Sequence, residues 1–243
     1  MQIKILFTGC SYFSGTPSVT YVFDSLLKKE NIDSQIISAC SPGNSNTTII
    51  KNVYDLINEY NVTDSIIFCQ LTHLHRIGFF HDIIDNWVDY QPEWFTSKPK
   101  LNEITKSLEF NYKIEQFENK LQTYGTNSIF PSKDIENKLR DAYTSYLTFV
   151  YNELETFKYL MYKVDLLSSY CLTKNCKIFF LYWPLIKSES QINELSKRSF
   201  ISIENNFSIL DHTTKNNLIN KDDSHLSLDG LDFMSKILYN YVK

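Results

Sequence analysis

Short apolar runs alternate with amphipathic stretches along the first third of the chain. The runs at 2–8, 34–39 and 64–71 are nearly continuous in apolar residues, which is typical of strands buried on both faces. The stretches at 19–29 and about 45–60 repeat their apolar residues at the helical period. This order of strand and helix predicts a parallel sheet with helices on both faces, a three-layer α/β/α sandwich.

The rest of the chain continues this pattern after an irregular segment. In chain order, the expected elements are a long helix at 134–172, a strand at 177–183, a short helix at 191–197, a strand at 207–210, a polar loop at 211–224 and a closing helix at 228–241. We expect all of them to belong to a single domain that covers residues 1–243.

The irregular segment lies at 78–133 and is rich in aromatic residues. It is too aromatic for a disordered linker, so we expect a mostly helical insertion or lid. Its aromatic side chains suit either packing of the lid onto the sheet or a platform that stacks on sugar rings, and packing is the more common use.

Composition narrows the classes of partner. The chain has 24 basic and 28 acidic residues, a net charge of −4 and no block of like charge, which argues against nucleic acid. No signal peptide and no apolar run of membrane-spanning length is visible, so we expect a cytoplasmic protein without a membrane partner. The five cysteines are an odd number and widely spread, which favours reduced thiols.

Two segments near the ends of the chain carry candidate chemistry. The first strand ends at Gly9, which places Ser11 at the carboxyl edge of the sheet, where ligands bind in open α/β folds. His225 precedes the last helix, and Asp222 lies three residues earlier, close enough to fold back onto the imidazole. A serine needs such a base to become a nucleophile. The alternative is structural, with Ser11 as a helix cap and His225 as a loop residue beside the cap Ser227.

These two segments resemble the first and last blocks of the SGNH/GDSL hydrolase superfamily. Gly9 and Ser11 match the family's Gly-Asp-Ser, with Cys10 in place of the aspartate, and Asp222 and His225 match its Asp-x-x-His. The resemblance covers the whole chain as short blocks in order. It implies a flavodoxin-like sheet and hydrolysis of esters, often acyl groups on carbohydrates or lipids.

The middle blocks match less well. Gly43 matches the second-block glycine, whereas the third block, Gly-x-Asn-Asp, aligns with residues 70–73, so that Thr72 stands where the family has asparagine. The resemblance implies an oxyanion hole built from the backbone N–H groups of Ser11 and Gly43 and a third-block side chain. We expect another polar side chain to replace the asparagine, with Asn46 and Thr72 as first choices.

The predicted function is therefore that of a serine esterase or deacylase. Ser11 would be the nucleophile, His225 the general base and acid, and Asp222 the orienting carboxylate, with a small-molecule or carbohydrate ester as substrate and no cofactor or metal. The alternative is a weak or inactive module that uses the same fold for binding or assembly. A nucleotide-binding domain is disfavoured because the residues around Ser11 lack the required glycine spacing.

Other polar residues near the predicted site have open roles. Asn44 and His73 are further candidates for contact with substrate. Arg76 could hold an anionic substrate group or form a salt bridge to the insertion. His73 and His75 are too few for a confident metal site, and Cys10 fits a small apolar filler beneath the site.

Overall fold

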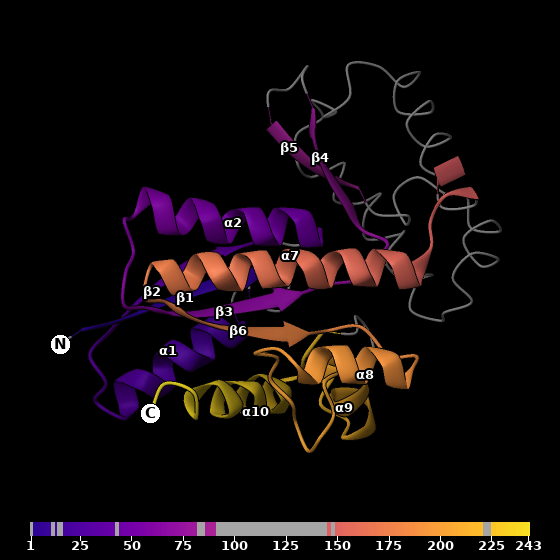
Figure 1. Ribbon diagram of the computed structural model, residues 1–243. Coiled ribbons are helices and arrows are strands. Elements are labelled where there is room, and N and C mark those ends of the chain that lie inside the picture. The colour runs from indigo at the N-terminus through magenta and orange to yellow at the C-terminus, as the bar shows by residue number, and fades with distance from the viewer. Residues whose placement is uncertain are drawn as a thin grey trace, which may run out of the picture.

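A parallel four-stranded sheet forms the centre of the protein. The computed structural model describes residues 2–10, 13, 17–41, 44–81, 86–90, 145–146, 149–220 and 225–243, with the backbone alone for 77–81 and 86–90. The strands are β1 (Ile3–Gly9), β2 (Ser34–Cys40), β3 (Ile66–Leu71) and β6 (Lys177–Tyr182), in the order β2-β1-β3-β6 (Figure 1). All neighbours are parallel, and the order is flavodoxin-like, as predicted.

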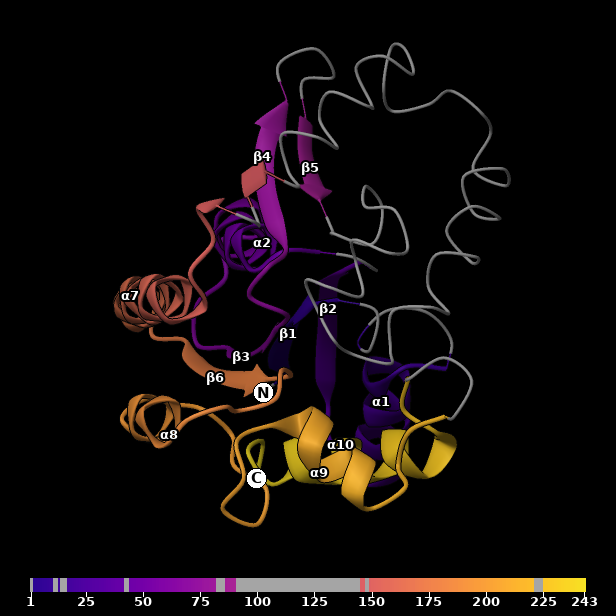
Figure 2. The same ribbon diagram turned by 90° about the vertical axis from the view of Figure 1, so that its right-hand side faces the viewer.

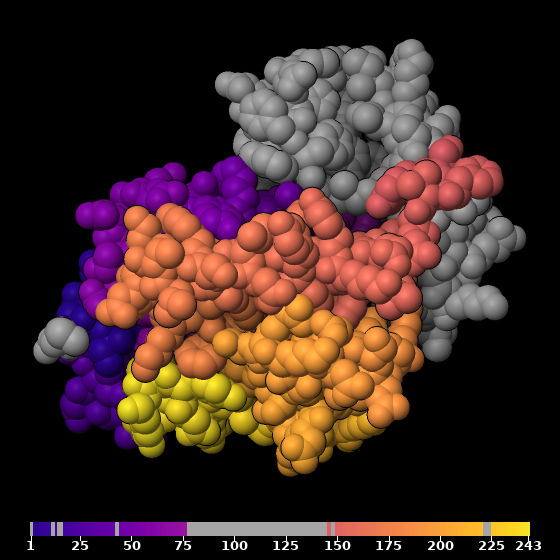
Figure 3. Space-filling model, viewed as in Figure 1, coloured from indigo at the N-terminus to yellow at the C-terminus, as the bar shows by residue number. Residues whose placement is uncertain are grey.

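Helices cover both faces of this sheet. One face carries α1 (Val19–Lys29) and α10 (Leu228–Tyr239), and the other carries α2 (Asn46–Glu59) and α7 (Glu153–Thr173) (Figures 1 and 2). Two shorter helices, α8 (Glu189–Ser196) and α9 (Ile209–Lys215), follow β6. In the space-filling view α7 runs along the visible face between α2 and α8 (Figure 3). The expected three-layer α/β/α sandwich is confirmed.

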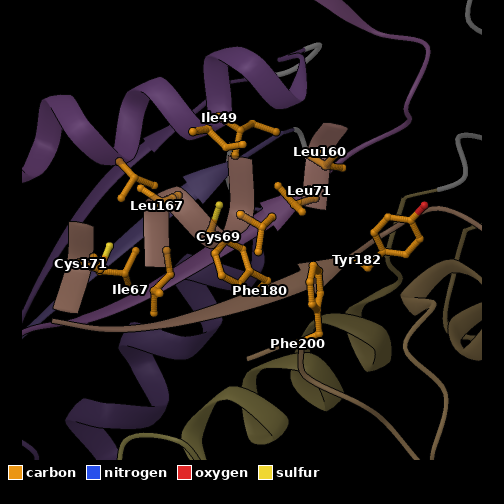
Figure 4. Packing of buried hydrophobic residues seen from close by; sticks show 14 of the residues in the cluster. Ile49, Ile67, Cys69, Leu71, Leu160, Leu167, Cys171, Phe180, Tyr182 and Phe200 are labelled. Atoms are coloured by element: carbon orange, nitrogen blue, oxygen red, sulfur yellow. The ribbon is translucent and has the colours of Figure 1, made fainter. Parts of the chain in front are cut away.

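The alternation of side chains along β3 divides the core into two layers. Ile67 and Cys69 pack against α2 and α7 (Figure 4), whereas Phe68 packs on the opposite face against α1 and α10. Gln70 has the same parity as Phe68 and is 1% exposed, so a polar amide is buried near the carboxyl end of the sheet.

Short polar residues start the helices and fix where they begin. Each caps its helix by accepting a hydrogen bond from a backbone N–H of the first turn. The caps are Ser18, Ser45, Asn152, Ser188, Ser208 and Ser227. The expected cap Ser227 is thus confirmed, and α10 begins directly behind His225. Within the described ranges, no helix combines the length and apolar character needed to cross a membrane.

The segment after β6 differs from the sequence prediction. In place of a strand at 207–210, Ser208 forms a single bridge to Tyr182 and then caps α9 through a 3.1 Å hydrogen bond from the N–H of Asp211. The predicted strand is therefore wrong, and so is the predicted loop at 211–215. The apolar residues that suggested a strand supply the buried first turn of a short helix instead.

The long helix and the insertion also need correction. The helix begins at Glu153 and not at 134, because Asn152 caps it after a turn in which the N–H groups of Val150 and Tyr151 both donate to the carbonyl of Tyr146. Residues 134–144 lie outside the described residues.

The first part of the predicted insertion is a two-stranded antiparallel ribbon of β4 (Ile77–His81) and β5 (Asn86–Tyr90). A helical insertion is wrong for this part, where aromatic residues favour strands. Residues 82–85 and 91–133 lie outside the described part of the chain, and the lid role stays a prediction.

The cysteines are all free, as predicted, and burial makes several of them unreactive. Burial raises the pKa of the Cys69 thiol and of the Cys171 thiol to about 12 in each case. Each thiol is therefore held in its protonated form, whereas the thiolate is the reactive species. We expect Cys69 and Cys171 to react with Ellman's reagent only after unfolding in guanidinium, with peptide mapping as the measurement. Rapid labelling of either thiol in the native protein would contradict this buried packing.

Candidate active site at the carboxyl edge of the sheet

The candidate site residues follow the carboxyl ends of adjacent strands. Ser11 follows β1, Gly43 follows β2, and Asp222 belongs to the last loop, but all three lie outside the described residues. Cys10, directly before Ser11, and Asn44, directly after Gly43, are described, whereas the nearest described residues to Asp222 are Asn220 and His225.

The turn after β1 is held by a buried amide from β3. The N–H of Cys10 donates to Oε1 of Gln70 at 3.3 Å, and an added Cβ on Gly9 would lie 2.9 Å from the same oxygen. Beyond the turn, Phe13 donates its N–H to the carbonyl of Cys10 at 3.1 Å. Gln70 therefore anchors the chain directly before position 11, and Cys10 is 1% exposed within the core, as expected for a filler.

The segment after β2 is tied to the end of β1 and to the residues that follow β3. Nδ2 of Asn44 donates to the carbonyl of Gly9 at 3.0 Å. Asn46 holds the backbone of Thr72 on both sides, because its Oδ1 accepts from the Thr72 N–H at 2.7 Å and its Nδ2 donates to the Thr72 carbonyl at 3.0 Å. The side-chain amides of Asn44 and Asn46 are thus both bonded to backbone groups, and Asn46 holds the backbone of Thr72 in place.

The segment after β3 gathers several polar side chains. Thr72 is 1% exposed, and its Oγ1 accepts a 2.9 Å hydrogen bond from Nη1 of Arg76. The rings of His73 and His75 stack with centroids 5.2 Å apart. Thr72 is consequently fixed through its backbone by Asn46 and through its hydroxyl by Arg76.

The loop that carries His225 is closed like a hairpin. Ile219 and Leu226 form an antiparallel bridge, and the N–H of Asn220 donates to the carbonyl of His225 at 2.6 Å. Ser227 then caps α10 through the N–H of Gly230 at 3.2 Å. His225 is partly buried and held directly between this closure and the start of α10.

Residues from the N-terminal and C-terminal parts of the chain line one small cavity. Phe13 lines it from the turn after Ser11, and Leu226 lines it from the residue after His225. Its lining is almost wholly apolar and is completed by Val19, Gln70, Leu181, Trp183, Ile209 and Met234. The turn after β1 and the loop before α10 therefore each contribute one apolar side chain to the same small cavity.

Gln70 is a site residue that the sequence prediction missed. Its signal was a polar residue inside an otherwise apolar strand, but the sequence does not reveal that its partner is the backbone of Cys10. Among the described residues, no three His, Cys, Asp or Glu side chains gather in a way that could hold a metal ion.

Replacing Gln70 with Leu should cost both stability and activity. The change leaves the buried N–H of Cys10 without its acceptor, which should lower the free energy of unfolding by about 1–3 kcal/mol, and it frees the turn that leads to Ser11. Urea unfolding and ester hydrolysis measure the two effects.

Gln191→Leu is the matched control, because Gln191 is also buried and its Oε1 accepts from the N–H of Lys187 at 2.7 Å. That bond holds the start of α8 and not the turn before Ser11. This variant should lose similar stability and keep its activity. Equal activity in both variants would contradict a positioning role for Gln70.

Comparison with known proteins gives similarities of fold. No family model and no curated protein matches the sequence. The lipase/acylhydrolase from Enterococcus faecalis is 10% identical, with 99% of this chain and 95% of that chain covered at a TM-score of 0.49. The esterase EstA from Pseudoalteromonas sp. is 12% identical, with 98% and 96% covered at 0.48. A family 3 carbohydrate esterase from Clostridium thermocellum is 13% identical, with 99% and 94% covered at 0.39.

Proposed function

We propose that the chain is a serine ester hydrolase, an esterase or deacylase, with Ser11, His225 and Asp222 as its triad. The observation that supports the proposal is that Phe13, two residues after Ser11, and Leu226, directly after His225, pack around one small space in the core. Phe13 and Leu226 lie more than 200 residues apart in the sequence, and yet they pack around this same space. The resemblance of the segments around Ser11 and His225 to SGNH hydrolase blocks adds to this support.

Strand register supports a place for Thr72 in the same site. Thr8 pairs with Cys69 across β1 and β3, and both Ser11 and Thr72 come three residues later. The guanidinium of Arg76 cannot accept a hydrogen bond, so Oγ1 of Thr72 accepts there and keeps its own proton for another acceptor. Thr72 is thus suited to donate to an oxyanion at this edge, in place of the family's asparagine.

The proposed reaction proceeds in two steps. His225 takes the proton of Ser11 as Oγ attacks the ester carbonyl, and the tetrahedral oxyanion receives hydrogen bonds from Thr72 and from the backbone N–H groups of positions 11 and 43. Collapse breaks the C–O bond, and the alcohol leaves with the proton from His225. Water then attacks the acyl-serine by the same route and releases the acid. Asp222 would orient the imidazole and stabilise its charged form.

A screen of short-chain aryl esters against the wild type and Ser11→Ala tests this proposal. We expect hydrolysis of at least one 4-nitrophenyl ester by the wild type and its loss in the variant. Equal rates for the two proteins on every ester would favour the alternative of a binding module on the same fold.

A further inference from the structure

Arg76 is a buried cation that has no carboxylate partner among the described residues. Its side chain lies just beyond β3 and is 9% exposed. Nη1 donates to the neutral hydroxyl of Thr72, whereas Nε is buried and has no hydrogen-bond partner in the described part of the chain. A buried charge is costly unless it is paired, so this guanidinium favours a negative partner beyond those that the described residues supply.

Arg198 shows how this protein neutralises an arginine. Its Nε and Nη2 donate to the two carboxylate oxygens of Asp165 at 2.7 and 2.8 Å, and its Nη1 donates to Glu194 at 2.9 Å. In Arg76 the same Nε–Nη2 edge has no hydrogen bond to any described residue, although Arg76 is the more buried of the two. This edge presents two parallel N–H groups, the geometry that matches a carboxylate or a phosphate.

The position of this edge is fixed before any ligand arrives. Asn46 clamps the backbone of Thr72, and Thr72 holds Nη1 of Arg76. The N–H of Arg76 also donates to the carbonyl of His73 at 3.3 Å, which closes the turn that carries the side chain. A guanidinium held in this way loses little conformational freedom when it binds an anion.

We infer that the Nε–Nη2 edge of Arg76 binds a carboxylate or phosphate group of a ligand at the carboxyl edge of the sheet. The identity of that ligand rests on the proposed function: in an ester hydrolase, the ligand at this edge is the ester substrate, and the group that Arg76 binds is an anionic substituent of it. Thr72 then serves two neighbours, accepting from Arg76 and donating toward the reacting carbonyl.

Thermal unfolding in the presence of small anions tests this site without any turnover. The probes are sodium phosphate and sodium acetate, each compared with sodium chloride at equal ionic strength. We expect one of the two to raise the Tm of the wild type by about 2–4 °C at saturation, and the effective anion identifies phosphate or carboxylate as the group. Arg76→Gln should lose this rise, and the matched control Arg198→Gln should keep it.

A second readout does not depend on the stability of a variant. In the wild type, the Nε–Hε resonance of Arg76, assigned by its absence from Arg76→Lys, should shift on titration with the effective anion. An unchanged resonance, together with equal Tm values in phosphate, acetate and chloride, would overturn the inference. A full rise of Tm in Arg76→Gln would overturn it as well. A protein that binds the anion through Arg76 but hydrolyses no ester would refute the proposed function and leave the anion site standing.

Discussion

Ser11→Ala should lower kcat for ester hydrolysis by a factor of about 10⁴ or more, with little change in the free energy of unfolding. A triad acts as a unit, so removal of the nucleophile leaves the remaining groups with binding and oxyanion stabilisation only. Steady-state kinetics on the best 4-nitrophenyl ester measure the loss, and urea unfolding checks the fold.

Non-additivity provides the control for this prediction. If Ser11 and His225 work together, the double variant Ser11→Ala/His225→Ala should be no slower than Ser11→Ala by itself. A further hundredfold drop in the double variant would contradict a shared role and would point to His225 acting independently.

Gly230→Ala should lower the free energy of unfolding by about 3 kcal/mol. A Cβ on Gly230 would lie 2.1 Å from the carbonyl oxygen of Leu218 and 3.2 Å from Cδ2 of Leu226, so α10 must move away from the loop that carries His225. The same carbonyl accepts hydrogen bonds from the N–H of Ser227 at 2.9 Å and from its hydroxyl at 3.1 Å, and these would weaken too. Urea unfolding measures the loss, and activity should fall with it.

The sign of this effect is diagnostic. In an unhindered helix Gly→Ala stabilises by up to about 1 kcal/mol, so a more stable Gly230→Ala protein would contradict the close packing of α10. Lys236→Ala is the control on the exposed side of the same helix, and it should change stability by less than about 0.5 kcal/mol.

The parts of the fold that follow from local patterns could be predicted from the sequence. Continuous apolar runs identified the four sheet strands, and the helical period together with Ser227 identified the start of α10. The seven residues of α9 could not be identified, because a buried first turn such as Ile209–Leu210 has no period long enough to tell a helix from a strand.

The candidate site also has features that the sequence predicts and features that only the structure reveals. The sequence singled out Asn46 and Thr72 as polar residues near the missing asparagine, but their difference in role depends on contacts across 26 residues of chain. The Asn46 amide is engaged by the Thr72 backbone, and the Thr72 hydroxyl is oriented by Arg76. The Asn46–Thr72 pairing depends on how the start of α2 packs against the end of β3, which no local spacing encodes.

Covalent labelling with a fluorophosphonate tests the central claim most directly. An activated serine attacks the phosphorus and expels fluoride, so the protein gains one phosphonyl group that peptide mass spectrometry can place. We predict a single label on Ser11, slowed strongly in His225→Ala and absent from Ser11→Ala. No labelling of the native wild type, or a label on another serine that persists in Ser11→Ala, would contradict the assignment of Ser11 as the nucleophile.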